Sequence, residues 1–209
     1  MMHCLVGSEM CIRDSYIPLS SAQDHKRIGD GDTGPNTGGM GAYSPAPVFT
    51  QAIQDQVNKE MIEPTLKAMR DLGTPYQGIL YAGVMIKNNY AKLVEYNVRF
   101  GDPECQVLML RLRSDIVELI LGTIEGNIHK IHTDWNNNHV ATVVMASNGY
   151  PGEYKKGTII RSLEAAENLA NIEVFHAGTE FKNNEVLAVG GRVLSVTSSD
   201  RDLKSALEN

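Results

Sequence analysis

Apolar and polar side chains alternate along the segment from Val94 to Phe100. Successive side chains of an extended strand point to opposite faces, so Glu95, Asn97 and Arg99 would share one face. A carboxylate and an amide oxygen on one rigid face suit a hard cation such as Mg²⁺. An arginine one step further along can bind a phosphoryl or acyl-phosphate oxygen. The opposite face would be apolar and buried, with Val94, Tyr96, Val98 and Phe100.

The residues after this segment favour a functional interpretation of the pattern. An edge strand with one solvated polar face would show the same alternation. Here, however, residues 101–104 read GDPE, which predicts a sharp polar turn where the strand would end. A strand that ends in such a turn can hold reactive groups at the rim of a site.

A second polar region lies earlier in the chain. Residues 23–27 read QDHKR and bring an acid, an imidazole and two cations into one turn of chain. Residues 30–45 are rich in glycine, which lets backbone N–H groups approach a ligand closely. A glycine-rich segment by itself is more often a linker, so its composition leaves both interpretations open.

These segments carry a resemblance to a known family. Residues 95–104 read EYNVRFGDPE and resemble the metal- and phosphate-binding strand of the ATP-grasp ligases, in the longer form of the phosphoribosylamine–glycine ligase family. The QDHKR segment and residues 36–41, NTGGMG, are similar to segments that border the substrate site of that family. The resemblance extends over residues 16–207 and corresponds to the C-terminal half of the ligase.

The resemblance implies an ATP-dependent C–N ligase of de novo purine biosynthesis. Its substrates would be the small molecules ATP, glycine and 5-phosphoribosylamine. Glycine would form glycyl phosphate, and the amine would then displace phosphate to give glycinamide ribonucleotide and ADP. The N-terminal half of the same enzyme, with the adenine site and the lid, would be a missing partner, so this chain would be a fragment that is inactive alone.

The resemblance also implies roles for individual residues. Glu95 and Asn97 would bind Mg²⁺ or Mn²⁺ that bridges the ATP phosphates, and Arg99 and Asp102 would be catalytic. The substrate-binding residues would be Asp24, Lys26, Asn36, Thr37, Gly38, Gly39, Gly41 and Pro103. Many ATP-grasp enzymes have another carboxylate on the preceding strand, but residues 83–85 are Gly, Val and Met here, which argues against a paired two-metal site.

Two alternatives remain beside this function. One is another ATP-grasp carboxylate–amine ligase, such as a formate-using purine enzyme, although the loop at residues 32–44 argues against it. The other is a non-catalytic nucleotide-binding remnant that has kept the fold.

The remaining pattern predicts an α+β fold with two parts. Residues 16–125 would form the C-terminal part of an ATP-grasp domain, an antiparallel sheet with helices, and residues 126–209 a small, truncated β-rich domain. A helix capped by Thr50 and kinked at Pro64 would precede a hairpin that delivers the polar strand. Asp115 would cap a later helix.

Residues 1–15 fit neither a helical nor a strand period and have no counterpart in the ligase family. They resemble a translated adaptor, so we predict a non-native leader that lies outside the fold. A short disordered or swapped N-terminal arm is the alternative.

Composition limits the function classes. The net charge is -6 and no basic block is present, which argues against nucleic acid as the main partner. No apolar run approaches the length of a membrane span. The three cysteines show no paired spacing, which favours a cytoplasmic setting.

Overall fold

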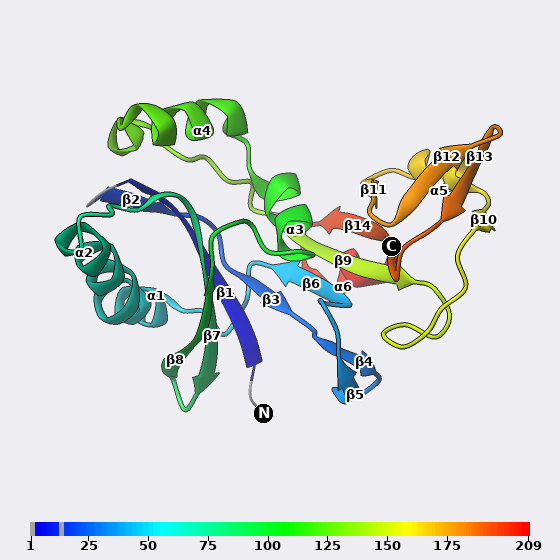
Figure 1. The fold of residues 1–209 in the computed structure, drawn as a ribbon, viewed down its shortest axis with the longest axis horizontal. Helices are drawn as coiled ribbons and strands as arrows, with labels where there is room; N and C mark the ends of the chain where they lie inside the picture. The colour runs from blue at the N-terminus through cyan, green and yellow to red at the C-terminus, as the bar shows by residue number, and fades with distance from the viewer. Residues whose placement is uncertain (1–2, 13–14) are drawn as a thin grey trace.

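A nine-stranded sheet forms the centre of the computed structural model, which describes residues 3–12 and 15–209 (Figure 1). The strands run in the order β11 (Ile172–His176), β14 (Arg192–Asp200), β9 (His139–Ala146), β6 (Gly41–Ser44), β3 (Ala22–Asp24), β1 (His3–Ile12), β7 (Gln77–Lys87) and β8 (Tyr90–Asn97). β2 (Ser15–Pro18) pairs with β1 beside this path. Neighbouring strands are antiparallel, and helices cover the sheet, so the predicted α+β class is confirmed.

Two smaller sheets flank the main one. β4 (Arg27–Gly29) and β5 (Thr33–Asn36) form a hairpin between β3 and β6. β10 (Thr158–Ile160), β13 (Glu185–Ala188) and β12 (Thr179–Lys182) form the small sheet of the C-terminal part. The main sheet continues past the predicted division at residue 126, because β6 pairs with β9. The division of the chain at that residue stays a prediction.

β1 is a central strand, so the prediction that residues 1–15 lie outside the fold is wrong for residues 3–12 and Ser15. Residues 1–2 and 13–14 of the predicted leader lie outside the described residues. Its backbone pairs with β7 along its whole length, from His3 to Ile12, and with β3 and β2 on the other side. Cys11 packs in one core cluster, whereas Met10 and Ile12 pack in another. A strand that is buried on both faces shows no alternation of polar and apolar residues, which explains why the pattern gave no strand signal. The predicted foreign origin of the segment concerns the gene and stays a prediction.

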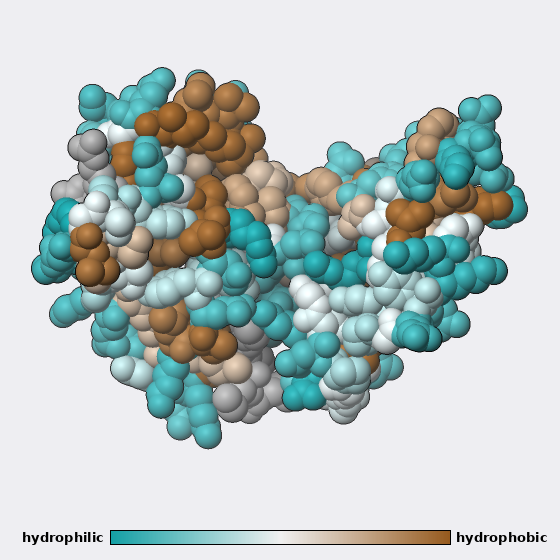
Figure 2. All heavy atoms as spheres, viewed as in Figure 1, coloured by the Kyte–Doolittle hydropathy of each residue, from teal (hydrophilic) through white to brown (hydrophobic). Residues whose placement is uncertain are grey.

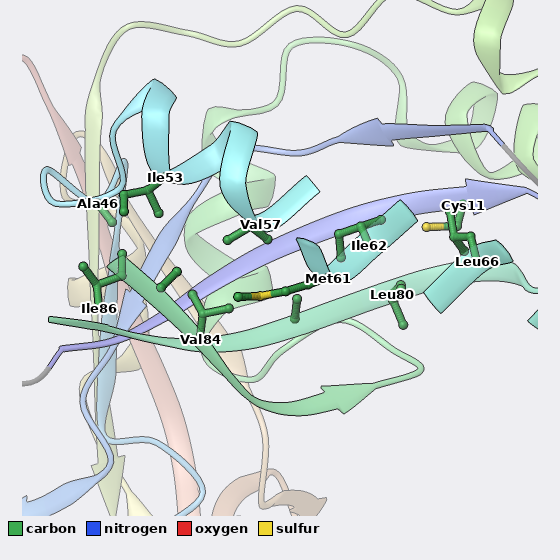
Figure 3. Close-up of a cluster of buried hydrophobic side chains, with 12 residues drawn as sticks. Cys11, Ala46, Ile53, Val57, Met61, Ile62, Leu66, Leu80, Val84 and Ile86 are labelled. Atoms are coloured by element: carbon green, nitrogen blue, oxygen red, sulfur yellow. The ribbon is translucent and has the colours of Figure 1, made fainter. Parts of the chain in front are cut away.

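A bent helical layer covers one face of the sheet. α1 (Gln51–Val57), η1 (Asn58–Ile62) and α2 (Glu63–Asp71) follow one another without a break. The Thr50 side chain accepts a hydrogen bond from the Ile53 N–H, which confirms the predicted cap. The π-helical turn of η1 immediately precedes Pro64, whose missing N–H disturbs the helical ladder as predicted. The buried side chains of this layer meet those of β1 and β7 in the cluster of Figure 3.

Further helices pack elsewhere on the sheet. α4 (Ile116–Glu125) begins at Asp115, whose side chain accepts a hydrogen bond from the Val117 N–H, as predicted for a cap. Its Leu119 packs with Ile128 of η2 (Ile128–Lys130) against β1. The outer side of α4 is apolar, and Figure 2 shows a brown, hydrophobic surface over this helix. Its exposed apolar side chains are Val117, Ile120, Leu121 and Ile124.

Three shorter helices complete the fold. α3 (Glu104–Arg111) follows the GDPE turn and packs its Val107 against β3, β6 and β9. α5 (Leu163–Glu167) lies beside β11, and α6 (Leu203–Glu208) lies against β9 and β14. In the described residues, no helix is long and apolar enough to span a membrane.

The central position of β1 gives a stability prediction. Met10→Ala should lower the free energy of unfolding by about 2–5 kcal/mol, because it leaves a cavity at a fully buried side chain. Val98→Ala, at a side chain that is 74% exposed, is the matched control and should change it by less than about 0.5 kcal/mol. Urea denaturation of both variants measures the difference. Equal stabilities would contradict the placement of β1 in the core.

Candidate active site

β8 carries a bulge immediately before the predicted metal ligands. β7 pairs Gly83 with Glu95 and Val84 with Leu93, so Val94 is an extra residue on β8. Val94 is therefore 57% exposed, and Val98, which follows the end of the strand, is exposed too. The prediction that both are buried is wrong.

Tyr96 does lie on the buried side of β8. It packs on the helix-covered core, and its hydroxyl donates to the Met61 carbonyl at 2.9 Å. Phe100 packs in the core cluster beneath α4. The predicted packing face therefore holds at Tyr96 and Phe100, but not at Val94 or Val98.

Gly83 makes room for Glu95 across the β7–β8 ladder. A Cβ atom at Gly83 would lie 3.1 Å from the Glu95 Cγ. The Glu95 side chain is about half exposed, and its Oε1 accepts a hydrogen bond from the Lys26 Nζ at 3.3 Å. Asn97 pairs with Tyr81 of β7. The structure thus brings the predicted metal strand against the predicted substrate segment.

Lys26 stands between two carboxylates. Its Nζ lies 3.3 Å from Glu95 and 3.8 Å from the Oδ2 of Asp24. Asp24 belongs to β3, and its side chain is 2% exposed. A half-buried cation between two acids lowers their mutual repulsion. It also leaves a positive group where an anionic ligand can approach.

Asp24 is the most strongly perturbed group among the predicted site residues. Burial raises its pKa to about 7, with a further increase from the charge of Glu104. The charges of Lys26 and Arg192 and a backbone hydrogen bond from His25 act in the opposite direction. The Oδ1 atom of Asp24 is buried and has no hydrogen-bond partner. A buried polar atom without a partner is costly, and such atoms mark places where a ligand can complete the bonding.

Glu104 is a second buried acid at the same place. Burial raises its pKa, and the Tyr81 hydroxyl donates to its Oε1 at 2.9 Å. Gly101 permits this packing, because a Cβ atom there would lie 2.5 Å from the Glu104 Oε2 and 2.6 Å from the Tyr81 ring. The GDPE turn therefore directs one acid inward and leaves Asp102 at the surface.

The glycine-rich segment lies directly over Asp24. The Thr37 N–H and hydroxyl both donate to the Lys26 carbonyl, at 2.7 and 2.9 Å. The Gly39 N–H donates to the Thr37 Oγ1 at 3.0 Å. Gly39 has a φ of +116°, and a Cβ atom there would lie 2.5 Å from the Pro103 Cδ and 2.9 Å from the Asp24 Oδ1. Only glycine fits this crossing of two segments.

Other predicted residues lie away from this contact. The Arg99 guanidinium is exposed and donates to the Phe100 carbonyl at 2.7 Å, with no ion pair to another described residue. Asn36 is exposed at the end of β5. Gly41 belongs to β6, where a Cβ atom would lie 2.7 Å from the Thr142 carbonyl oxygen, so close strand packing explains this glycine.

Sequence reasoning missed two contacting residues from the C-terminal part. Arg192 forms an ion pair with Asp102, with 2.8 Å between Nη2 and Oδ2. Tyr150 accepts a hydrogen bond from the Gly38 N–H at 3.2 Å. The GGR sequence at residues 190–192 signals a turn only, and no local pattern relates it to a segment about 150 positions away.

The residues present fit a hard cation in chemical type. Glu95 and Asn97 supply two oxygen donors, and Mg²⁺ commonly takes few protein ligands and completes its octahedron with water and phosphate oxygens. Within the described residues, no group of three or more His, Cys, Asp or Glu could hold a metal ion.

Comparison with known proteins identifies the family. Residues 4–105 match the ATP-grasp (A) domain of phosphoribosylglycinamide synthetase, and residues 140–209 match the C domain of the same enzyme. The chain belongs to the phosphoribosylglycinamide synthetase family. The match to the A domain starts within β1, which agrees with the place of that strand in the sheet.

Individual relatives support the family assignment. The chain is 55% identical over 199 residues to the chloroplastic phosphoribosylamine–glycine ligase of Arabidopsis thaliana. The aligned region covers 93% of this chain and 37% of that relative. The chain is 52% identical over 195 residues to the ligase of Brucella melitensis, and the aligned region covers 92% of this chain and 46% of that relative. The crystal structure of the Thermotoga maritima ligase superposes with a TM-score of 0.86 at 29% identity, over 98% of this chain and 50% of that one. The chain thus spans about half the length, or less, of these relatives.

The buried position of Asp24 gives a pH prediction. Its raised pKa means that the folded state binds the proton more tightly than the unfolded state, so stability falls as the pH rises from about 4 to about 7. Across this window the free energy of unfolding of the wild type should fall more steeply than that of Asp24→Asn, by up to about 1.4 kcal/mol per pH unit.

Denaturation at pH 5 and pH 7.5 measures this difference. Burial also raises the pKa of Glu9 to about 8, but Glu9 is present in both proteins and cancels in the comparison. Parallel pH profiles would show that Asp24 is not buried as an acid.

Proposed function

We propose that this chain is the C-terminal part of a phosphoribosylamine–glycine ligase and contributes the phosphate- and amine-handling side of its active site. The reaction would join glycine to 5-phosphoribosylamine at the expense of ATP, through glycyl phosphate. The observation that carries the proposal is the contact between Lys26 and Glu95, which joins the substrate segment to the metal strand. The family assignment supports the same reaction.

Glu95 and Asn97 are proposed as the residues that hold Mg²⁺ or Mn²⁺ and, through it, ATP. The bound cation would neutralise charge on the phosphates during transfer. Glu95 now accepts from Lys26, so a cation at this carboxylate would compete with the ammonium group. Lys26 would then be available to an anionic group of the substrate.

The two buried acids beside the glycine-rich loop, Asp24 and Glu104, suit the step in which the amine attacks the acyl phosphate. Attack by an amine on an acyl phosphate releases a proton, and a nearby acid with a pKa of about 7 can accept it at neutral pH. Asp24 has such a pKa, and its Oδ1 is unpartnered. We assign Asp24 and the loop of Thr37, Gly38 and Gly39 to the amine substrate. Pro103 and Gly41 would shape the site by packing, and Asn36 would border it.

Arg99 and Asp102 remain proposed catalytic residues. Arg99 is exposed just after the end of β8, and its guanidinium donates to one backbone carbonyl, that of Phe100, so its other N–H groups are available to an acyl-phosphate oxygen. Asp102 is bound to Arg192 and therefore acts from a fixed position. The expected cytoplasmic location and the absence of a nucleic-acid partner stay predictions.

A first test concerns the length of the chain. Because the relatives are about twice as long or longer, we expect the 209 residues alone to release no ADP that depends on both glycine and phosphoribosylamine. A chain completed with the N-terminal half of a relative should do so. Turnover by the short chain would show that it already contains a full nucleotide site.

A second test addresses the metal strand in the completed chain. Glu95→Gln keeps the size of the side chain and removes its charge, so kcat should fall by roughly 10²–10³-fold, the scale of losing one electrostatic stabiliser. The melting temperature should stay near that of the wild type, because the side chain is half exposed. Glu180→Gln, at an exposed position of β12, is the matched control.

The opposite face of β8 provides the complementary variant. Tyr96→Ala should cost about 3–5 kcal/mol of stability if this ring packs like a core phenylalanine, while any folded enzyme keeps its Mg²⁺ requirement. Thermal melts and Mg²⁺ titrations compare the two variants. If Glu95→Gln unfolds the protein and Tyr96→Ala shifts the metal titration, the register of β8 is wrong.

A further inference from the structure

Arg192 reaches from the first residue of β14 back to the candidate site. Its Nη1 donates to the carbonyl oxygens of Gly38, Gly39 and Asp102, at 3.1, 3.3 and 2.9 Å. Its Nη2 donates to the Asp102 Oδ2 at 2.8 Å. One side chain of the C-terminal part thus contacts both the glycine-rich loop and the turn that follows the metal strand.

The loop is shaped to admit this guanidinium group. A Cβ atom at Gly38 would lie 3.0 Å from both Cζ and Nη2 of Arg192. The Arg192 side chain is 22% exposed, so water screens its ion pair only in part. A planar guanidinium can satisfy several acceptors at once in a fixed geometry, which the ammonium of lysine cannot reproduce.

Tyr150 supplies a second, independent contact from the same part of the chain. Its hydroxyl accepts from the Gly38 N–H at 3.2 Å. The Tyr150 ring packs on Gly191, where a Cβ atom would lie 2.4 Å from its Cδ2. Gly38 is therefore bonded to the C-terminal part through both of its backbone groups. Its N–H donates to the Tyr150 hydroxyl, and its carbonyl accepts from Arg192.

The position of this loop determines what covers Asp24. Gly39 lies against both Asp24 and Pro103, and a Cβ atom there would fall within 2.9 Å of the unpartnered Asp24 Oδ1. A small shift of residues 38–39 would change the space above that oxygen. Whatever fixes the loop therefore fixes the access of a substrate to Asp24.

We propose that Arg192 is a positioning residue for the amine substrate, which it serves by holding Gly38 and Gly39 over Asp24. The C-terminal part is then a functional component of the active site rather than an appendage. This inference rests on the proposed function for the identity of the substrate. The hydrogen-bonded anchor itself can be tested without it.

The anchor is tested on the 209-residue chain by hydrogen exchange. Arg192→Ala should speed exchange of the amides in residues 37–40 by at least about tenfold, because the loop loses the two hydrogen bonds that its Gly38 and Gly39 carbonyls accept from this side chain. Arg192→Lys keeps the charge and should exchange nearly as fast as the alanine variant. Arg201→Ala is the matched control, since that arginine is exposed and pairs with Asp202, the N-cap residue of α6. Unchanged exchange in Arg192→Lys would overturn the anchor, even if Arg192→Ala does not fold.

The functional role is tested by kinetics in a chain completed with the N-terminal half of a relative. Both Arg192 variants should raise the KM for phosphoribosylamine by roughly 10–100-fold, the effect expected of a misplaced substrate contact. The KM for ATP should change by less than about twofold, since Glu95 and Asn97 lie outside the anchored loop. A uniform loss for both substrates, or none, would overturn the positioning role. If the wild type itself does not ligate glycine, the proposed function fails, whereas the exchange result still decides the anchor.

Discussion

The pairing of β1 with strands on both sides is the constraint on which the site depends. β7 and β8, which carry Glu95, lie on one side of β1, and β3, which carries Asp24, lies on the other. β1 pairs with β7 along its whole length and with β3 at Leu5 and Val6, and this pairing holds the two groups of strands in register. Its side chains join the cores above and below the sheet. Without this strand, Lys26 would not be held within reach of Glu95.

Local signals in the sequence predicted the elements around the site well. Thr50 and Asp115 cap helices because their side chains satisfy N–H groups of the first turn. The hairpin of β7 and β8 follows from Asn88 and Asn89, which both adopt a positive φ. The same signal occurs at Asn183 and Asn184, which both adopt a positive φ between β12 and β13.

Features that depend on tertiary structure could not be read from the chain. β1 gave no strand pattern because both of its faces are buried. The bulge at Val94 has no local signature, since valine fits an ordinary strand equally well. The family motif located Asp24, Glu95 and the glycine-rich loop, but not the burial that makes Asp24 a weak acid. That property arises from Gly39 and Glu104, which come from distant parts of the sequence.

The site balances several acids with few cations. Asp24 and Glu104 are buried, and Glu95 and Asp102 are partly exposed. In the part of the chain that the structure describes, the cations that pair with these acids are Lys26 and Arg192. Burial raises the pKa of Asp24 to about 7, so this carboxyl adds less than a full negative charge at neutral pH. Burial raises the pKa of Glu104 as well. The two cations are then matched to the two outer carboxylates. A divalent cation bound at Glu95 would compete with Lys26 for this carboxylate and release the ammonium group. Arg192 would keep its hydrogen bonds, because they go to the carbonyls of Gly38, Gly39 and Asp102 and not to Glu95. Lys26 is therefore the cation that a bound metal ion would displace, whereas Arg192 is held by three backbone carbonyls and Asp102.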